Sequence, residues 1–367
     1  MNKDILKNDE RAVYALRSLF RQYGYLPFKM SKFEEYDLYV KNKDFLVSDK
    51  VITFSDTNGK LMALKPDVTL SIIKNGEDEE GCKQKVYYNE NVYRVSGSTH
   101  QFRELMQAGV ECIGDIDLYD TVEIISLAAK SLELISPDYV LEICHLGILE
   151  AFLDACTNDG KLKGEMTALI SEKNVHDLRR ICAEGSVGKK EADDLCALVG
   201  TYGDMRSVIN RLYPLCISDA AKAALAELDK LCSMLENTGL DKKIRFDFSV
   251  VNDMSYYNGT VFCGFVSGIC ESVLAGGRYD RLLTRMGRKS GAIGFAIYLD
   301  LLEELDRGTD TIDVDVLVLY DDESAAEAHA AVNRLIAEGK SVSAQKNVPA
   351  KLRYGTVEDI RGGTKNA

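Results

Sequence analysis

The sequence predicts an α+β fold in which a mixed, mostly antiparallel sheet is flanked by helices and interrupted by an inserted helical domain. Between residues 246 and 280, alternating apolar residues and the Asn258-Gly259 pair indicate successive strands joined by a tight turn. Between residues 161 and 242, apolar residues recur at helical spacing instead. A final segment opens with the apolar strand VDVLVLY and continues into a helix, which predicts a small α/β unit.

A chain of 367 residues normally forms two or three compact domains. The changes of pattern divide this chain into four segments, of which two form a single core. We expect the first part of the core over residues 1–155 and its second part over 244–306. The helical domain is expected between them, over 156–243. A polar linker leads to the small C-terminal unit, which is expected over 312–367.

The composition is that of an ordinary globular protein, with 46% hydrophobic and 28% charged residues. The sequence has no run of about 18 apolar residues and opens without a signal-peptide pattern, so we expect a cytoplasmic location and no membrane partner. The net charge of −13 argues against tRNA as a partner, because binding a polyanion normally requires a basic surface.

Metal and cofactor sites are not predicted. The ten cysteines are spaced singly without a CxxC pair, and the four histidines show no paired helical spacing. Most cysteines lie in apolar runs, which favours buried, reduced thiols over disulfides or zinc ligands. His145 lies where an apolar strand meets a helix, and we expect a hydrogen-bonded core histidine there.

The first third of the chain contains several elements that bear on a binding site. Residues 9–23 have one apolar stripe at helical spacing, and residues 25–40 are expected to be extended. A hairpin then leads to Pro66 at the first position of a helix, with Asp67 beside it. An aspartate at such a position is commonly a partner of the helix dipole, and ligand binding is the alternative.

A candidate binding strand follows at residues 103–114. Gln107, Gly109 and Glu111 alternate along it and therefore share one face. A glutamate on the interior face of a sheet needs a partner, so we expect Glu111 to form an ion pair or to contact a ligand. Asp120 is expected to cap the helix that comes next.

Paired glycines mark a second candidate, because Gly276 and Gly277 permit a ligand to approach the backbone closely beside the Arg-Tyr-Asp sequence at 278–280. The alternative is a structural role for the whole stretch from 246 to 280, as an antiparallel meander with a tight turn. Both interpretations stay open at this point.

Five motifs in series resemble histidyl-tRNA synthetase over nearly the whole chain. They are MALKPDVT at 62–69, the VYR to CIG segment at 92–114, the FDFS to VF segment at 246–262, AGGRYDRLL at 275–283 and GAIGFAI at 291–297. One such motif is weak evidence for a family, whereas five motifs in the same order are specific evidence. The resemblance implies a class II aminoacyl-tRNA synthetase-like core and makes the last segment a truncated relative of an anticodon-binding domain.

The chain is more similar to a sibling family, the regulatory subunits of ATP phosphoribosyltransferase. The PDVT form of the first motif and the CHLGIL segment around His145 carry this similarity. It implies a non-catalytic protein of histidine biosynthesis that activates a short-form ATP phosphoribosyltransferase catalytic subunit and takes histidine as effector. It also implies a homodimer within a larger hetero-oligomer, a hetero-octamer.

The positions that hold ATP in the synthetase are only partly kept. Arg94 matches the first of three arginines, but Asn252 and Leu301 stand where the resemblance predicts the other two. Adenylate formation depends on cations that stabilise charge at the α-phosphate, so we expect no aminoacylation. Arg94 and Arg278 are candidates for anion binding.

The amino-acid half of that site is better preserved, and the resemblance implies histidine binding by eight residues. They are Asp67, Thr69, Gln107, Glu111, Tyr257, Gly276, Gly277 and Tyr279. Carboxylates can accept from an ammonium and an imidazole N–H, an amide adds a donor and an acceptor, and tyrosines provide flat walls with polar tips. The alternative is that these residues serve only in packing.

Two other functions stay open. An active, truncated histidyl-tRNA synthetase would need replacement cations, for which Arg278 and Arg285 are the candidates. A stand-alone histidine-binding protein with another partner would carry the same pocket. The C-terminal unit is smaller than a typical compact domain, which argues against tRNA binding in each case.

Overall fold

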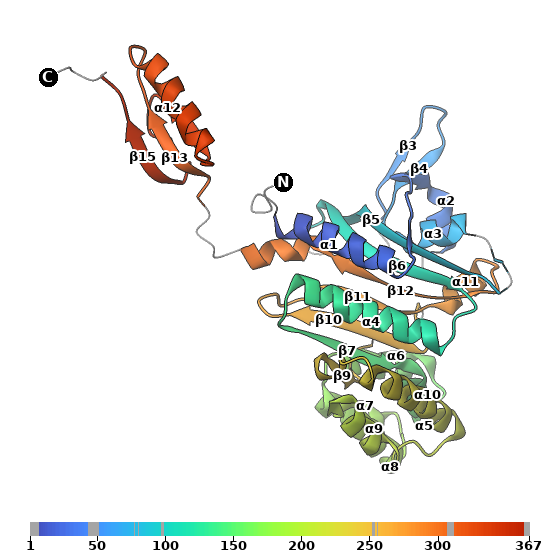
Figure 1. Ribbon diagram of the computed structural model, residues 1–367. Helices are drawn as coiled ribbons and strands as arrows, with labels where there is room; N and C mark the ends of the chain where they lie inside the picture. The colour runs from blue at the N-terminus through green and yellow to red at the C-terminus, as the bar shows by residue number, and fades with distance from the viewer. Residues whose placement is uncertain are drawn as a thin grey trace. The chain divides into compact units, whose positions relative to one another are not determined.

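The structure is a computed structural model that describes residues 7–42, 51–76, 78–79, 81–96, 99–251, 254, 256–306 and 312–362. The described residues fall into two compact units, Met1–Leu305 and Asp306–Ala367. A large sheet organises the first unit and a small one organises the second (Figure 1).

The central feature of the first unit is a sheet of nine described strands in the order β1-β5-β6-β12-β11-β10-β7-β9-β8. They are β1 (Leu26–Pro27), β5 (Lys83–Val95), β6 (Phe102–Gly114), β7 (Tyr139–His145), β8 (Tyr202–Gly203), β9 (Ile244–Asp247), β10 (Thr260–Val266), β11 (Leu274–Arg278) and β12 (Gly291–Tyr298). Among these strands the β1–β5 and β7–β9 pairs are parallel and the other pairs antiparallel, so the predicted mixed, mostly antiparallel sheet is confirmed.

Two helices, α1 (Asn8–Gln22) and α4 (Leu118–Ile135), cover one face of this sheet (Figure 1). The apolar residues of α1 recur at helical spacing, so Leu16 and Phe20 are buried together against the sheet. Phe20 and Phe262 of β10 both meet Phe295 of β12 edge-on. This face holds the main hydrophobic core.

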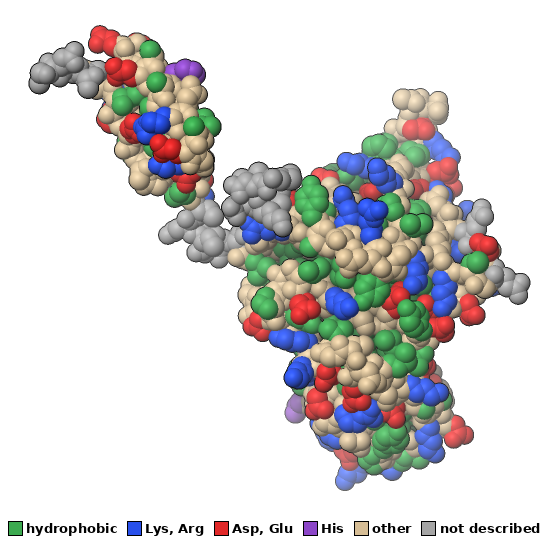
Figure 2. All heavy atoms as spheres, viewed as in Figure 1, with side chains coloured by type: hydrophobic (Ala, Val, Ile, Leu, Met, Phe, Trp, Pro, Cys, Tyr) green, Lys and Arg blue, Asp and Glu red, His purple; other side chains and the backbone are tan. Residues whose placement is uncertain are grey.

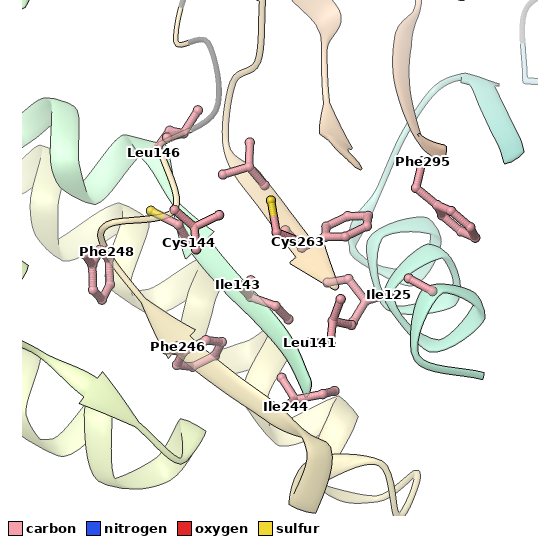
Figure 3. Packing of buried hydrophobic residues seen from close by; sticks show 14 of the residues in the cluster. Ile125, Leu141, Ile143, Cys144, Leu146, Ile244, Phe246, Phe248, Cys263 and Phe295 are labelled. Atoms are coloured by element: carbon pink, nitrogen blue, oxygen red, sulfur yellow. The ribbon is translucent and has the colours of Figure 1, made fainter. Parts of the chain in front are cut away.

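The helical region between β7 and β9 packs onto the same core. It consists of α5 (Leu146–Cys156), α6 (Gly160–Ser171), α7 (Val175–Glu184), α8 (Lys189–Val199), α9 (Met205–Leu212) and α10 (Asp219–Glu236). Side-chain caps begin several of these helices, for example where Ser218 accepts from the N–H of Ala221. Figure 3 shows the packing that joins α4, β7 and β9, through Ile125, Leu141, Ile143, Ile244 and Phe246.

The Asn258-Gly259 turn connects two strands that do not pair with each other. Gly259 has a φ of +69°, as such a turn requires, but β9 pairs in parallel with β7. β10 lies antiparallel on the other side of β7. The expected pairing of the two strands that flank this turn is therefore wrong, because an earlier strand occupies the position between them. The meander is formed by β10, β11 and β12.

The first unit also contains a three-stranded sheet of β2 (Phe33–Glu35), β4 (Leu61–Leu64) and β3 (Thr53–Ser55), with helices α2 (Tyr36–Lys41) and α3 (Thr69–Asn75). The expectation of an extended chain over 25–40 is wrong for its last residues, because a helical segment buries Tyr39 there. α3 begins at Thr69 rather than at Pro66, with Val68 as its N-cap, and the Asp67 carboxylate accepts from the N–H of Leu70 in its first turn.

The N-cap of α4 is not the expected residue. Asp117 is the N-cap, and its Oδ1 accepts from the N–H of Asp120 at 3.2 Å. Asp120 accepts in return from the N–H of Asp117 at 2.9 Å, which completes a reciprocal capping box. Asp120 is therefore the third residue of the helix, and its predicted role as the cap is wrong.

Short helices follow the last strands of the first unit. β11 leads into α11 (Asp280–Arg285), β12 leads into the 3-10 helix η4 (Leu299–Asp306), and η3 (Asp241–Lys243) precedes β9. The second unit is a parallel sheet of β13 (Val314–Leu319), β14 (Val342–Gln345) and β15 (Tyr354–Asp359) with α12 (Ala325–Ala337). None of the described helices is both long and apolar enough to cross a bilayer.

Truncation of Phe262 to Ala should lower the free energy of unfolding by about 3–5 kcal/mol, because its fully buried ring packs beside Phe295 in the main core. Urea denaturation followed by circular dichroism measures this change. Phe102→Ala is the control, since that ring is 73% exposed. A surface truncation should change the free energy of unfolding by less than about 0.5 kcal/mol, and equal losses in the two variants would contradict the described core.

Candidate functional site

A buried carboxyl group lies at the centre of the large sheet, on the face opposite α1 and α4. It belongs to Glu111 of β6, which is 2% exposed. Thr69 Oγ1 donates to its Oε1 at 2.9 Å, and Tyr279 Oη donates to its Oε2 at 2.5 Å. The alternation of β6 determines this placement, because Val110 and Cys112 belong to the main core on the other side. Among the residues that the structure describes, the partners of Glu111 are thus two hydroxyl groups rather than a cation.

Burial raises the pKa of Glu111 to about 8. The hydrogen bonds from Tyr279 and Thr69 oppose this shift, and the charge of Asp67 adds to it. Burial also raises the pKa of Asp67, against the N–H of Leu70 and the charge of Arg94. Both carboxyl groups are poorly hydrated, which disfavours their ionised form. They therefore favour a ligand that brings a positive charge or N–H donors, because such a ligand stabilises the ionised form.

Tyrosine rings form the walls around these carboxyl groups. The rings of Tyr256 and Tyr257 are 4.5 Å apart, and that of Tyr279 is 5.6 Å from Tyr256. Tyr88 of β5 and Tyr298 at the end of β12 complete the set. Burial raises the pKa of all five hydroxyl groups, so each one keeps its proton at neutral pH and can act as a donor.

These side chains enclose a cavity of about 450 Å³, a volume typical of small-ligand sites. Six of the eight residues expected to bind histidine line it: Asp67, Thr69, Gln107, Glu111, Tyr257 and Tyr279. They come from the segment before α3 and its first residue, from β6, from the segment before β10 and from the N-cap of α11. The structure therefore brings together residues that lie far apart in the sequence.

The two expected glycines lie on different faces of β11. Gly277 lies against Tyr257, where an added Cβ would be 2.9 Å from the ring, so glycine is needed for this close approach. Gly276 pairs with Phe262 and Phe295, and an added Cβ there would be 2.8 Å from the Phe262 ring. Gly277 thus lies on the face of the sheet that carries Glu111, outside the residues that line the cavity, whereas Gly276 makes room in the main core.

Of the two arginines considered for anion binding, Arg94 lines the cavity and Arg278 does not. Arg94 Nε donates to the carbonyl of Pro66 at 3.1 Å. Arg278 forms an ion pair with Asp280 at 2.7 Å and lines another cavity, of about 920 Å³. The alternation of β11 accounts for this difference, because Arg278 lies between Gly277 and Tyr279, which lie on the side of the sheet that carries Glu111.

Two positions that depart from the synthetase pattern were expected to lack a cation. Leu301 lies in η4, where it is half-buried and packs against the main core. Asn252 lies outside the described residues. Leu301 therefore contributes an apolar contact where the resemblance predicts an arginine.

His145 is buried at the junction of β7 and α5 but lacks the expected hydrogen bond. Its Nε2 is 3.6 Å from the carboxylate of Glu227, beyond hydrogen-bond distance, and neither ring nitrogen has a hydrogen-bond partner among the described residues. Over the same ranges of the chain, no three His, Cys, Asp or Glu side chains gather in a way that could hold a metal ion.

Comparison with known proteins places this chain in a family. The family model described as histidyl-tRNA synthetase matches residues 3–302. The chain belongs to the histidyl-tRNA synthetase family. It is similar to proteins named ATP phosphoribosyltransferase regulatory subunit, at 29% identity over 92% of this chain and 90% of the Clostridium kluyveri protein. The Oceanobacillus iheyensis protein of that name is 28% identical over 82% of this chain and 74% of its own length. The resemblance found in the motifs is confirmed.

Solved structures of this family share the fold. One described as an ATP phosphoribosyltransferase regulatory subunit/histidyl-tRNA synthetase from Bacillus halodurans has a TM-score of 0.74 and 25% identity, over 97% of this chain and 94% of that one. A chain of the ATP phosphoribosyl transferase (HisG:HisZ) complex from Thermotoga maritima has a TM-score of 0.62 and 19% identity, over 78% of this chain and 96% of that one. The predicted synthetase-like fold is therefore confirmed.

Sequence reasoning missed several residues of the cavity, including Tyr88, Tyr256 and Tyr298. A signal was present for Tyr298, because it follows Gly294 and Ala296 at the two-residue spacing of one strand face. Tyr256 stood beside a predicted site residue. Tyr88 required the register of β5 against β6, which the sequence does not contain.

The free protein should lose stability as the pH rises from about 4.5 to about 8, because folded Glu111 keeps its proton to about pH 8 and an unfolded glutamate releases it near 4.5. The contribution of protonated Glu111 to the free energy of unfolding is complete below the pKa of the unfolded state and is lost above the pKa of the folded state. It is on the order of a few kcal/mol. Urea midpoints across this range measure it. Glu111→Gln should flatten the profile, whereas Glu104→Gln, at an exposed position of the same strand, should not. Identical profiles for both variants would contradict the shift.

Proposed function

We propose that the protein is a non-catalytic regulatory subunit of ATP phosphoribosyltransferase, acting at the first step of histidine biosynthesis, and that it binds histidine in the cavity around Glu111. One observation carries the proposal, namely the chemistry of the lining. One buried and one half-buried carboxyl group, those of Glu111 and Asp67, line the cavity together with five tyrosine rings, and Arg94 is the only cationic side chain among its described residues. Such a lining suits a small amino acid, whereas the transfer chemistry of a triphosphate needs several cations.

Histidine matches this lining in both charge and shape. Its α-ammonium and its imidazole N–H are donors for the carboxyl groups of Glu111 and Asp67, and the amide of Gln107 offers both a donor and an acceptor. Arg94 provides the cation for the ligand carboxylate. The flat imidazole ring packs against tyrosine walls, which have polar tips for further hydrogen bonds.

The proposed partner is a short-form ATP phosphoribosyltransferase catalytic subunit, in a hetero-octamer that contains homodimers of this chain. Support comes from relatives named regulatory subunit and from the fold shared with a chain of the Thermotoga maritima complex. In this assembly, located in the cytoplasm, the protein activates its partner and makes it sensitive to histidine. On the face shown in Figure 2 basic side chains are interspersed with acidic ones, which together with the net charge of −13 argues against tRNA binding.

An active, truncated histidyl-tRNA synthetase has less support, because the two arginines that could replace its missing cations contact other groups. Arg278 is paired with Asp280, and Arg285 Nη2 donates to the carbonyl of Lys41 at 3.5 Å. Neither arginine lines the cavity around Glu111. A stand-alone histidine-binding protein differs from the proposed function only in its partner, so co-purification from the host separates the two.

The purified chain should give no histidine-dependent pyrophosphate exchange, yet should increase the turnover of a short-form ATP phosphoribosyltransferase catalytic subunit. The loss of one preorganised donor lowers a rate by about 10²–10³, so a site without two of its cations should not exceed background. Added histidine should inhibit the complex and leave the isolated catalytic subunit less affected. Robust exchange by the chain alone would favour the synthetase alternative, and absence of activation would favour the stand-alone one.

Free histidine should raise the melting temperature, because a ligand that binds the folded state stabilises it by mass action. Binding should also release protons near pH 7, since the α-ammonium group of the ligand favours the ionised form of Glu111, whose pKa is raised to about 8 in the free protein. Calorimetry in buffers with different ionisation enthalpies measures this release.

Glu111→Gln should abolish both the rise in melting temperature and the proton release. The matched control is Glu104→Gln, which removes the same charge at an exposed position of β6 and should leave both responses unchanged. An equal response of the two variants would show that histidine binds elsewhere.

A further inference from the structure

Small residues form the floor of the cavity around Glu111. Gly109 of β6 and Gly294 and Ala296 of β12 lie on the same face of the sheet as this carboxyl group. A Cβ at Gly294 would collide with Glu111 Oε2, and one at Gly109 would collide with the ring of Tyr88. The sheet is thus kept flat where a ligand has to lie close to the backbone.

Tyr298 interrupts this flat floor with a large ring. It follows Gly294 and Ala296 at the two-residue spacing of one strand face, pairs with Gln107 on β6, and lines the cavity. Burial raises the pKa of its hydroxyl group, and the charge of Arg94, which lines the same cavity, opposes that shift. The floor therefore ends at Tyr298.

The end of β12 is fixed, so the ring of Tyr298 does not move aside through a shift of the backbone. The N–H of Tyr298 donates to the carbonyl of Val273 at 2.9 Å. Two residues later, Asp300 Oδ1 accepts from the N–H of Met106 at 2.9 Å, and Leu301 packs against the main core. These contacts hold the chain on both sides of the strand end.

The charges of the cavity orient an amino acid toward this ring. Glu111 and Asp67 attract the ammonium and N–H groups, whereas Arg94, the sole cation among the described lining residues, attracts the carboxylate. Arg94 and Tyr298 line the same cavity, so a carboxylate bound at Arg94 shares this space with the Tyr298 ring. A large group attached to that carboxyl group would compete with the ring for the space.

We propose that Tyr298 restricts the site to amino acids with a free carboxylate and excludes ligands extended at the carboxyl group, such as aminoacyl adenylates and esters. The inference rests on the proposed function, because it takes histidine as the occupant of this cavity. The chain reads YLDL over residues 298–301, so a large aromatic ring follows the small residues Gly294 and Ala296 on this face of the strand. A single ring thus separates a site for a free amino acid from one with space for an adenylate.

The test compares two ligands on the full-length chain, L-histidine and the non-hydrolysable sulfamoyl analogue of histidyl-adenylate. Dissociation constants from calorimetry should show that the wild-type chain binds histidine at least about 10-fold more tightly than the analogue. Tyr298→Gly should reduce this ratio by about 10-fold or more, because it opens the floor beyond Ala296. Tyr298→Ala provides a second opening, and Tyr298→Phe is the matched control, which keeps the ring and should keep the wild-type ratio.

The outcomes separate this inference from the proposed function. Equal binding of the two ligands by the wild-type chain would overturn the role of Tyr298, as would a ratio that the Gly and Ala variants leave unchanged. If Tyr298→Phe also loses the preference for histidine over the analogue, the selectivity belongs to the hydroxyl group, and the role of the ring is overturned. Absence of histidine binding to the wild-type chain would overturn the proposed function itself. If Tyr298→Gly does not fold, the wild-type ratio and Tyr298→Ala decide.

Discussion

The buried carboxyl group of Glu111 is the constraint on which the site depends. A carboxyl group in the middle of a sheet is strongly destabilising unless hydrogen bonds compensate for its lost hydration. Thr69, at the start of α3, and Tyr279, after β11, provide those bonds from segments far apart in the sequence. Gly294 leaves the space that the carboxyl group fills. The contacts that satisfy Glu111 therefore also fix the positions of the elements that enclose the cavity.

The same contacts give a physical route from ligand to protein. In the free protein burial favours the protonated form of Glu111, whereas a cationic ligand favours the carboxylate. Hydrogen bonds to a carboxylate are shorter and stronger than those to a neutral carboxyl group, so ionisation tightens the bonds from Thr69 and Tyr279. Both donors lie at the start of a helix, α3 and α11. A change of charge inside the cavity, such as the proposed ligand would produce, would thereby change how firmly two helices are held.

Local patterns in the sequence predicted most elements, because alternation and helical spacing depend on neighbours in the chain. The family resemblance, rather than these patterns, predicted six of the residues that line the cavity as histidine-binding residues. The local patterns placed Gln107 and Glu111 on one face of a strand correctly. They could not separate Gly276 from Gly277, because the face on which each lies depends on the register with β10 and β12. The Asn258-Gly259 signal described its own turn but not the pairing of the strands on either side, which a distant strand determines.

The position of β7 between β9 and β10 has a consequence for synthesis on the ribosome. β7 ends at His145, whereas its two neighbours begin at Ile244 and Thr260, after the whole helical region. During synthesis, both edges of the apolar strand β7 therefore stay unpaired while α5 to α10 emerge from the ribosome. Non-local pairing of this kind slows folding, and open strand edges invite association between nascent chains. A chain released before β9 cannot complete its sheet, so premature termination here yields a product that chaperones must retain or proteases remove.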